Sequence, residues 1–536
     1  MDFETLTLDP CLAPSYASGI LSVPEGTLRE LSRIAFERIA FTFPKAHLDH
    51  LRQIAVNPVN SANDRMVSGC LLENAIIASE GIYPVCQDTG TAQVFAWKDE
   101  GVVTGADDRA ALAAGAEDAY TGRNLRYSTT VPRDLFTEED PRNNMPAQVL
   151  IESAAASGPR ERETEPSYRF LFCAKGGGSA NKTKLTQATK ALLNEASFTA
   201  YLEREIAALG TSACPPYTIA VVVGGISPEQ NLLALKLATA GLWSGEGDER
   251  DRAVMGVRPL RVPEWEAKVL EIAGATGIGA QFGGKALACE SVVLRLPRHG
   301  ASCPVSIGVS CSAHRNLFAR IDRAGVHVQR TVGDPTALPG LSDAAKLAEE
   351  VPPGAIMADL DRGLNAFRTA LKGIKPGTPV ILSGTLLVAR DAAHARWKSL
   401  LDKGEALPEY AREYAILYAG PAKTPEGAVS GSFGPTTAGR MDDYAELLMS
   451  RGVALVTLAK GNRSAAWAAS CAAHGGFYLG TMGGTAALIA KRHIVRSEII
   501  DYPELGMEAV RLVTVRNLPV FVLINDRGED FYRDLP

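Results

Sequence analysis

Hydrophobic and polar positions along the chain follow two spacings, one typical of helices and one of strands. Apolar residues recur at helical spacing in LRELSRIAFERIAFTF (28–43) and in the longer segment 182–210, which predicts one or two helices. The apolar run TIAVVVGG (218–225) predicts a buried strand. Ser227 and Pro228 suit the N-cap and first turn of a helix, which NLLALKLATAGL then continues. Alternating strands and helices predict a mixed α/β fold.

Two polar or proline-rich segments interrupt this pattern. Residues 134–165 are polar and contain proline, so we expect an exposed loop with a short strand at AQVLIES (147–153). Residues 331–355 are rich in proline and glycine, and short apolar runs alternate with helical patterns beyond them. Because 536 residues are too many for one ordinary core, we expect a larger N-terminal domain, residues 1–345, and a smaller C-terminal domain, residues 346–536.

Composition and charge argue against several classes of function. The net charge of −6 is small for 536 residues, and no run of Lys and Arg is interleaved with aromatic residues, so we expect no nucleic-acid partner. The longest apolar stretches are far shorter than the ~20 residues that span a bilayer, so we expect no membrane partner. The first residues, MDFETLTLDP, contain neither the basic nor the apolar region of a secretory signal, and we expect a cytoplasmic protein.

The nine cysteines are scattered, and none has the CxxC spacing of zinc ribbons or ferredoxin-type clusters. In a reducing compartment most of them are expected to be free and buried. Cys86 directly precedes Gln87 and Asp88. Cys214 precedes two prolines, which predict an extended chain and a fixed direction for the thiol, and Cys311 lies between an apolar run and the polar sequence SAHRN. Local spacing leaves open whether these three thiols share a metal site.

Glycine-rich segments recur along the chain, and four of the five contain Lys or Arg. They are AKGGGSANKT (174–183), GAQFGGK (279–285), SFGPTTAGR (432–440), LAKGNRS (458–464) and GTMGGTAAL (480–488). Consecutive glycines let backbone N–H groups approach an anion, so we expect an anion-binding site. The P-loop pattern fails because Asn181 stands where its second glycine is needed. An ATP-dependent ligase built on the Gly/Lys loops and a non-catalytic metal-binding protein both remain open as alternatives.

Long motifs in a fixed order resemble those of one enzyme family, class I, iron–sulfur-dependent fumarase. The similar motifs are CQDTGTA, AKGGGSANKT, CPPY, GAQFGGK, LPRHGASCPV, SCSAHRN, AGPAKTPEG, GPTTAGRMD, LAKGNRS, HGGFYLG and YPELGMEA. The resemblance runs from about residue 70 to the C-terminus. It implies an N-terminal α/β domain that binds the cluster and a C-terminal domain like the swivelling β/β/α domain. It also implies a homodimer.

The resemblance implies which residues bind the cofactor. Cys86, Cys214 and Cys311 match the family's three ligands of a [4Fe–4S] cluster whose fourth iron has no protein ligand. An open iron can act as a Lewis acid toward the substrate hydroxyl, whereas electron-transfer clusters use four cysteines. Cys303, eight residues before Cys311, is the nearest rival ligand and ranks lower because the match puts the ligand in SCSAHRN.

The resemblance also implies the substrate-binding and catalytic residues. Those that match are Gln87, Asp88, Arg126, Gly178, His299, Arg390, Thr436, Arg440 and Lys460. By resemblance Thr436 is the base that removes a proton, and Asp88 is the acid at the leaving hydroxyl. Four of these residues are cations: Arg126, Arg390, Arg440 and Lys460. They suit a small dicarboxylate with two negative charges, because Arg binds carboxylates with two parallel hydrogen bonds.

The implied activity is the reversible hydration of fumarate to (S)-malate. The related tartrate dehydratases divide the two domains between separate subunits, and mesaconate is a third candidate substrate. One turn departs from the family pattern, because this chain reads GGTAA with Thr485 where the family usually has GGPAA. The segment 134–165 also looks divergent, with extra acidic residues. Fumarate is therefore the expected substrate, with tartrate and mesaconate as alternatives.

Overall fold

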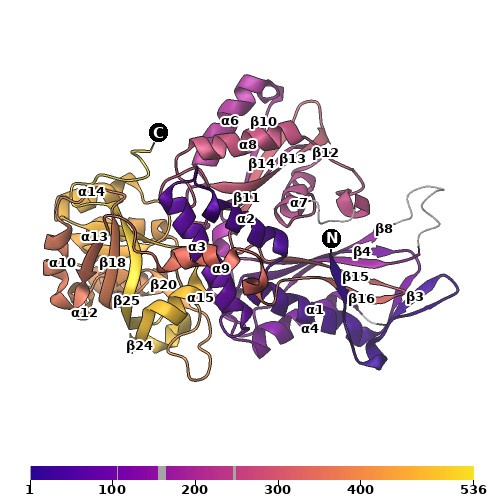
Figure 1. Cartoon of the computed structure of the whole chain (residues 1–536), viewed down its shortest axis with the longest axis horizontal. Coiled ribbons are helices and arrows are strands. Elements are labelled where there is room, and N and C mark those ends of the chain that lie inside the picture. The colour runs from indigo at the N-terminus through magenta and orange to yellow at the C-terminus, as the bar shows by residue number, and fades with distance from the viewer. Residues whose placement is uncertain (1, 106, 155–164, 245–248, 536) are drawn as a thin grey trace.

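The computed structural model describes residues 2–105, 107–154, 165–244 and 249–535. They form a mixed α/β fold, which confirms the predicted fold class. Figure 1 shows the C-terminal, orange-to-yellow part of the chain at one end of the molecule, with the sheets of the N-terminal part at the other. Helices from the N-terminal part lie between them, so the two parts meet along a broad junction.

The first sheet of the N-terminal part has six strands. In order they are β1 (Phe3–Thr5), β16 (Gly325–Gln329), β15 (Asn316–Asp322), β9 (Tyr168–Lys175), β4 (Thr91–Asp99) and β8 (Gln148–Ala154). Side chains of β4 alternate between the two faces, as a strand with both faces buried requires. Val94 and Ala96 join the core formed with α1 (Glu25–Phe41) and α4 (Asp108–Gly122), while Phe95 and Trp97 join the core on the opposite face.

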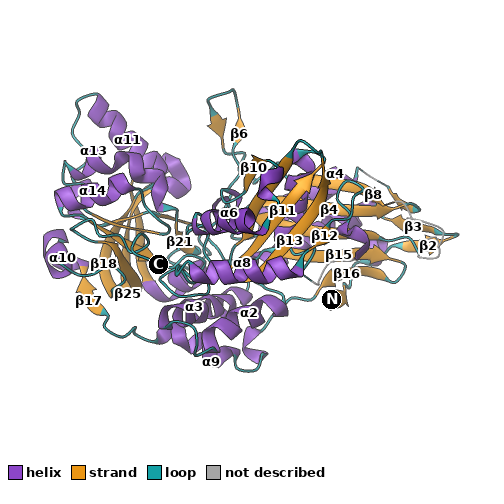
Figure 2. Cartoon of the chain, turned by 90° about the horizontal axis from the view of Figure 1, so that it is seen from above, coloured by secondary structure: helices purple, strands orange, loops and turns teal. Residues whose placement is uncertain are grey.

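The second sheet has five strands and lies beyond that opposite face. In order they are β10 (Lys184–Ala188), β14 (Cys303–Ser310), β11 (Tyr217–Gly225), β13 (Ala288–Arg298) and β12 (Leu260–Arg261). Leu235 and Leu237 of α7 (Pro228–Thr239) pack in a core shared by both sheets, and α6 (Glu195–Ala207) and α8 (Pro263–Ala275) cover the outer face. Figure 2 shows α6 and α8 in front of these strands.

Most of the predicted elements of this part are present. The periodic segment 28–43 forms α1, and the strand β11 leads into α7, whose residue Ser227 accepts a hydrogen bond from the Gln230 N–H at its N-terminus. The prediction for residues 182–210 is partly wrong. Only α6 is a full α-helix there, and β10 pairs antiparallel with β14 instead, because a neighbouring strand can override a weak helical pattern.

The polar segment 134–165 contains more structure than a loop. Val131–Pro132 (β6) and Glu138–Glu139 (β7) pair as a short antiparallel hairpin whose residues are mostly exposed. The expected strand at AQVLIES is present as β8. Residues 155–164 of the predicted loop lie outside the described residues.

The C-terminal part is built on a seven-stranded sheet. In order its strands are β17 (Ile356–Asp359), β18 (Pro379–Val388), β19 (Ile416–Leu417), β22 (Val456–Ala459), β23 (Phe477–Thr481), β25 (Val510–Ile524) and β24 (Ile494–Asp501). An additional pairing of β18 with β25 joins the run β18-β19-β22-β23-β25 end to end, so these five strands form a closed barrel. β18, β19, β22 and β23 are mutually parallel, so their carboxyl ends meet at one edge.

A continuous hydrophobic core joins the two parts of the chain. Helices α2 (Lys45–Val56) and α3 (Ala62–Ser79) share it with Trp397 and Trp467 of the C-terminal part. The rings of Phe282 and Phe521 stack across the junction with their centroids 4.1 Å apart. The division between residues 1–345 and 346–536 falls at the end of α9 (Leu341–Ala345) and stays a prediction.

Truncating Phe282 should loosen this junction. Phe282 is 3 % exposed, so Phe282→Ala removes a buried aromatic ring and should cost about 3–5 kcal/mol of stability. We expect a clearly lower Tm in thermal unfolding followed by calorimetry. Val59→Ala is the matched control because Val59 is 77 % exposed and should leave Tm unchanged. Equal Tm values for the two variants would show that the ring contributes nothing to the junction.

Candidate active site

Three cysteines from separate segments lie at the junction. Cys86 precedes β4, Cys214 precedes β11, and Cys311 follows β14. The prediction of an extended backbone at Cys214 is wrong, because this residue has φ +63° in the left-handed region. The backbone of Gly483, in the C-terminal part, packs directly against the Cys214 thiol. A Cβ on Gly483 would lie 2.3 Å from the Cys214 sulfur, so only glycine fits there. Backbone from both parts therefore surrounds this thiol.

The three thiols share one electrostatic neighbourhood. Burial raises the pKa of Cys214 to about 11, although the Lys460 ammonium donates a hydrogen bond to its sulfur at 2.8 Å. Burial also raises the pKa of Cys86, against the opposing charge of Arg315. At Cys311 burial acts in the same direction, but Arg315 and hydrogen bonds outweigh it and lower the pKa. Cys86 and Cys311 both influence Cys214, so the three sulfurs lie within reach of one another's charge.

Within the described ranges, no three His, Cys, Asp or Glu side chains converge closely enough to hold a single metal ion. The Ser312 hydroxyl, next to Cys311, is buried and has no hydrogen-bond partner among the described residues. Lys175 is likewise buried without a partner for its ammonium group, and burial lowers its pKa to about 8. Two buried polar groups without partners, the Ser312 hydroxyl and the Lys175 ammonium, therefore lie near Cys311, whose pKa the charge of Lys175 lowers.

A small, partly open cavity lies at the junction, and most of the predicted substrate residues line it. Its volume is about 30 Å³, and eight of the nine predicted residues line it: Gln87, Asp88, Arg126, Gly178, Arg390, Thr436, Arg440 and Lys460. The first four belong to the N-terminal part and the others to the C-terminal part. Their roles toward a substrate stay predictions.

Asp88 is held as a carboxylate. Its oxygens accept hydrogen bonds from Ser128 Oγ at 3.0 Å and from the Gly177 N–H at 2.9 Å, and Arg126 Nη2 lies 3.2 Å away. Burial opposes ionisation, but Arg126, Arg315 and these hydrogen bonds hold the pKa of Asp88 well below its usual range. An ionised Asp88 can accept a proton, and it can act as the predicted acid only after it has received one.

The cations of the C-terminal part come from strand ends. Arg390 follows β18 and Lys460 follows β22, so both lie at the edge where the parallel strands end. Arg390 Nη2 pairs with Glu508 Oε1 at 2.8 Å, and the less buried Arg440 lies 3.4 Å from Asp391. Burial opposes the charge on Lys460, but the neighbouring Cys214, Cys86 and Cys311 raise its pKa. Lys460 therefore stays charged beside the cavity.

The approach of the two parts depends on a glycine. Gln87 Nε2 donates a hydrogen bond to the Pro435 carbonyl oxygen at 3.2 Å, across the junction. A Cβ on Gly434 would lie 2.2 Å from Gln87 Oε1, so a side chain there would displace Gln87. Thr436 follows on the same segment, and its backbone carbonyl accepts a hydrogen bond from the Lys460 N–H at 3.2 Å. This contact fixes Thr436 relative to Lys460.

Sequence reasoning missed Arg315 and Glu508. Arg315 Nη1 donates a hydrogen bond to the Asp88 carbonyl oxygen at 2.5 Å, and its charge acts on Cys86 and Cys311. Both residues stand inside motifs already singled out, SCSAHRN and YPELGMEA. A charged residue inside a motif of the resemblance was the available signal.

His299 does not join the cavity within one chain. It is exposed in the turn between β13 and β14, and its Nδ1 accepts a hydrogen bond from the Ala301 N–H at 3.2 Å. Thr485, the departure from the expected turn, is buried but donates its hydroxyl hydrogen bond to the Met482 carbonyl oxygen at 3.2 Å. Thr485 does not line the cavity.

The glycine-rich segment AKGGGSANKT lies beside the cavity. Its Gly177 N–H binds the Asp88 carboxylate, and a Cβ on Gly176 would lie 3.0 Å from the same group. The anion that this segment binds in the structure is therefore the Asp88 carboxylate of the chain itself.

Among the helices of the described ranges, none is long and apolar enough to cross a membrane.

Comparison with known proteins agrees with this architecture. The family model described as "Fumarate hydratase (Fumerase)" matches residues 29–320, and "Fumarase C-terminus" matches residues 337–535. Fumarate hydratase 2 of Leishmania major is 46% identical over 96% of this chain and 87% of its own length. In Escherichia coli K12, the aerobic class I fumarate hydratase is 44% identical over 96% of this chain and 91% of its own length. The chain belongs to the class I fumarate hydratase family.

Proposed function

We propose that this chain catalyses the reversible hydration of fumarate to (S)-malate. The observation that carries the proposal is the cavity at the junction, which Arg126, Arg390, Arg440 and Lys460 line together. A C4 dicarboxylate has two negative charges that such cations can bind with charge-assisted hydrogen bonds. The names of the relatives, which match nearly the whole chain, support the same substrate.

A [4Fe–4S] cluster held by Cys86, Cys214 and Cys311 fits these residues. In such a cluster each cysteine binds a different iron, so the ligands need not converge as they do around a single ion. The buried Ser312 hydroxyl, which has no partner among the described residues, and the close approach of the Gly483 backbone to the Cys214 sulfur support the fit. When bound, the cluster would supply a Lewis-acidic iron for the hydroxyl that leaves as water.

The cations of the cavity bind and orient the substrate. Arginine forks and the Lys460 ammonium hold the two carboxylates across the junction. Removal of a proton next to a carboxylate builds up negative charge on that carboxylate, and cations already fixed in position stabilise this charge strongly. This electrostatic contribution is the largest that the chain itself makes to the reaction.

Thr436 and Asp88 move the two protons of the reaction. In the dehydration direction Thr436 removes the proton next to the carboxylate, and Arg440 and Lys460 beside it favour the ionised hydroxyl. Asp88, which is ionised, accepts a proton from water in the hydration direction. By microscopic reversibility it returns this proton to the leaving hydroxyl in dehydration, which is the predicted acid role.

The protein acts as a cytoplasmic homodimer in this proposal. All nine cysteines are free, which fits a reducing compartment. His299 is the one predicted substrate residue outside the cavity of its own chain, so its predicted role requires a second copy that presents it. Tartrate dehydratase and mesaconate hydratase activities remain the alternatives within the same reaction class.

Loss of any one ligand should release iron. We expect Cys86→Ser, Cys214→Ser and Cys311→Ser each to lower iron and sulfide content and to abolish turnover in protein prepared anaerobically. Cys471→Ser is the matched control because Cys471 is buried away from the cavity in the C-terminal part. If Cys303→Ser loses iron while Cys311→Ser keeps it, the third ligand has been assigned wrongly.

The interdomain cations should matter for catalysis. A hydrogen bond to a charged group contributes roughly 1.5–3 kcal/mol, so Arg390→Ala, Arg440→Ala and Lys460→Ala should each lower kcat/KM at least about tenfold. Arg396→Ala is the control, since Arg396 is 55% exposed and pairs with Glu504 at the surface. Wild-type kinetics in the three cavity variants would remove these residues from the substrate site.

The substrate is tested by assaying fumarate, mesaconate and both tartrate enantiomers side by side under anaerobic conditions. We expect the highest kcat/KM with fumarate. A site built to bind the extra hydroxyl of tartrate would leave polar groups unpaired with malate, so the two activities should differ strongly. A higher kcat/KM for mesaconate or tartrate would change the substrate and leave the hydro-lyase reaction in place.

A further inference from the structure

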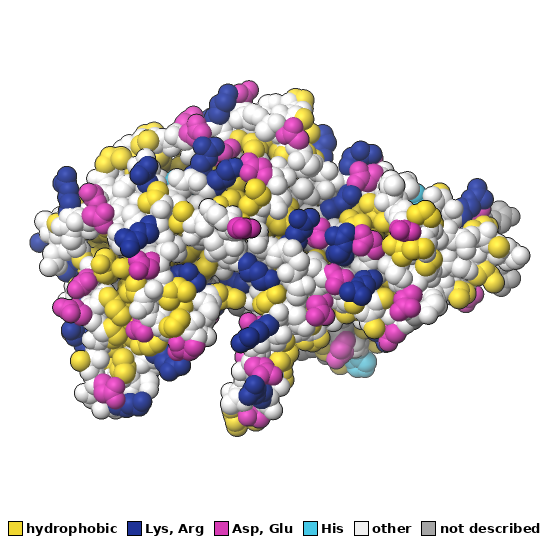
Figure 3. All heavy atoms as spheres, turned by 90° about the horizontal axis from the view of Figure 1, so that it is seen from below, with side chains coloured by type: hydrophobic (Ala, Val, Ile, Leu, Met, Phe, Trp, Pro, Cys, Tyr) yellow, Lys and Arg dark blue, Asp and Glu magenta, His cyan; other side chains and the backbone are white. Residues whose placement is uncertain are grey.

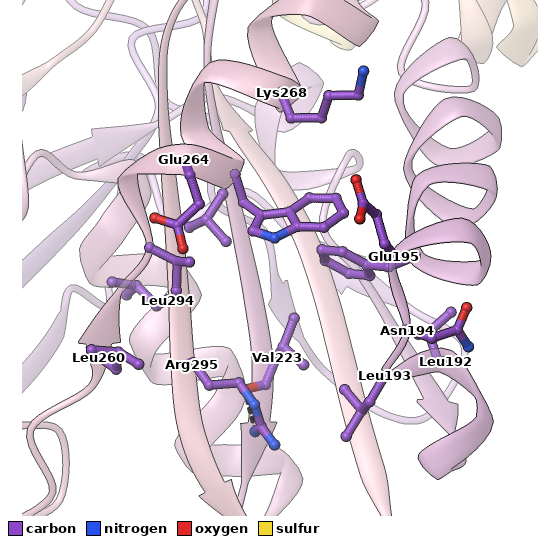
Figure 4. A pocket seen from close by; sticks show the side chains of 14 residues that line it. Leu192, Leu193, Asn194, Glu195, Val223, Leu260, Glu264, Lys268, Leu294 and Arg295 are labelled. Atoms are coloured by element: carbon purple, nitrogen blue, oxygen red, sulfur yellow. Dashed lines mark hydrogen bonds between the residues drawn. The ribbon is translucent and has the colours of Figure 1, made fainter.

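One lysine of the chain, Lys175, lies in surroundings unlike those of lysines at the surface. Figure 3 shows Lys and Arg side chains interspersed with Asp and Glu over one face of the molecule. Lys268 is an example of such a surface cation. It lines an open apolar groove of about 670 Å³ on the second sheet, shown in Figure 4, and its Nζ donates a hydrogen bond to Glu271 at 2.9 Å. A lysine in that position needs no further partner.

The side chain of Lys175 enters the core between the two sheets of the N-terminal part. Lys175 is the last residue of β9, and alternation along this strand puts it on the same face as Leu171 and Cys173, which belong to that core. A Cβ on Gly90 would lie 2.9 Å from the Lys175 carbonyl carbon, so the backbone that carries the side chain is tightly packed. Lys175 is 7% exposed, and its ammonium has no hydrogen-bond partner among the described residues.

The segment that contains the third cysteine runs beside the end of β9. The Ala174 N–H donates a hydrogen bond to the Arg315 carbonyl oxygen at 3.0 Å, and the His314 N–H donates one to the Cys311 carbonyl oxygen at 2.9 Å. Cys311 therefore lies one turn away from the residues that flank this strand end. Burial acts to raise the pKa of Cys311, but Arg315 and, more weakly, Lys175 contribute to lowering it. The ammonium is thus within reach of the Cys311 sulfur's charge.

The groups around this ammonium leave its charge uncompensated. Burial, with the charges of Lys236 and Arg315, lowers the pKa of Lys175 to about 8, while Cys173 and Cys311 act in the opposite direction. None of these four groups is a carboxylate. A lysine with this pKa is still mostly protonated at pH 7, and a buried charge without a partner is costly. The site therefore requires an anion that these side chains do not supply.

The other anions of the junction are held by other groups. The Asp88 carboxylate is bound by Arg126 and by the Gly177 N–H. The cavity for the substrate is lined by Gly178 of the same glycine-rich segment but not by Lys175. The anion that remains is the cluster itself, because its sulfide and thiolate sulfurs share a net negative charge and accept hydrogen bonds.

We propose that the Lys175 ammonium donates a hydrogen bond to a sulfur atom of the bound cluster on the side of Cys311. Only the presence of the cluster rests on the proposed function, because the buried, unpartnered ammonium is a property of the chain. Lys460 already donates a hydrogen bond to the Cys214 sulfur from the C-terminal part. Each part of the chain thus gives the cluster one lysine. Lys175 is a positioning residue, since it does not line the substrate cavity.

This pairing affects the redox behaviour of the cluster. Hydrogen bonds to the sulfurs and the net charge around a cluster set its reduction potential. A positive donor at a sulfur favours the reduced state, which carries more negative charge, so Lys175 raises the potential and makes the cluster harder to oxidise.

A redox titration followed by EPR tests the pairing without an assay of activity. In anaerobically prepared, cluster-loaded protein titrated with dithionite, Lys175→Met should have a more negative midpoint potential than the wild type. Lys175→Gln keeps a neutral donor and should lie between the two. Lys236→Met is the matched control, because Lys236 is half-buried on α7 and its loss removes an equal charge near Lys175. An unchanged potential in Lys175→Met, or an equal shift in Lys236→Met, would overturn the proposal.

Pulsed EPR in D₂O tests the contact directly. The reduced cluster of the wild type should show coupling to an exchangeable deuteron that is lost in Lys175→Met and retained in Lys236→Met. An unchanged deuteron coupling in Lys175→Met would show that the ammonium binds only water, and would overturn the hydrogen bond to the cluster.

Iron and sulfide content separates this inference from the proposed function. A wild type without iron and sulfide after anaerobic preparation would overturn the cluster and, with it, the pairing. A cluster-loaded wild type beside Lys175 variants of wild-type potential would overturn the pairing alone. Greater loss of iron from Lys175→Met than from Lys236→Met, with both variants folded by calorimetry, would support the pairing.

Discussion

Buried charge at the junction of the two parts is the constraint on which the rest of the site depends. A charge removed from water must be paired or hydrogen-bonded, because its desolvation is otherwise too costly. Arg315 is buried there and Arg126 and Lys460 are half-buried, and the charge of each acts on Asp88 or on the cysteine sulfurs. The cations need anions to offset them, and the Asp88 carboxylate and a dicarboxylate substrate are anions that this arrangement can accept.

The fold brings these charges together through strand ends and glycines. Arg390 and Lys460 follow parallel strands of the C-terminal barrel, whose carboxyl ends meet at the edge that faces the N-terminal part. Gly434 and Gly483 let the two backbones approach closely, because a Cβ at either position would overlap Gln87 or Cys214. Neither part alone contains both the cysteines and these strand-end cations. The site therefore exists only while the two parts are packed together.

The sequence predicts the elements whose pattern is local and long. The periodicity of 28–43 and the strand-to-helix step at Ser227 are both present in the structure. The strand β10 was missed because its partner β14 lies more than a hundred residues away, and no local spacing reports such a pairing. The hairpin at 131–139 was missed because its exposed residues carry no hydrophobic alternation.

The candidate site could be named only through the resemblance to a family. Local spacing left Cys86, Cys214 and Cys311 unconnected, since three distant segments must fold before their sulfurs come within reach of one another's charge. The resemblance named most of the residues that line the cavity. It missed Arg315, whose role lies in contacts with Asp88 and the cysteines. His299 was named by the same motif match, yet it lies outside the cavity of its own chain, because a motif carries no information on which surface the residue will face.

The central claim is that cations from both parts of the chain bind two carboxylates at once. Competitive inhibition of anaerobically prepared protein by succinate and by butyrate tests this most directly, because the two differ by one carboxylate on the same four-carbon skeleton. One charge-assisted interaction contributes roughly 1.5–3 kcal/mol, so succinate should bind at least about tenfold more tightly. Equal inhibition by the two acids would contradict the claim that the junction is built for a dicarboxylate.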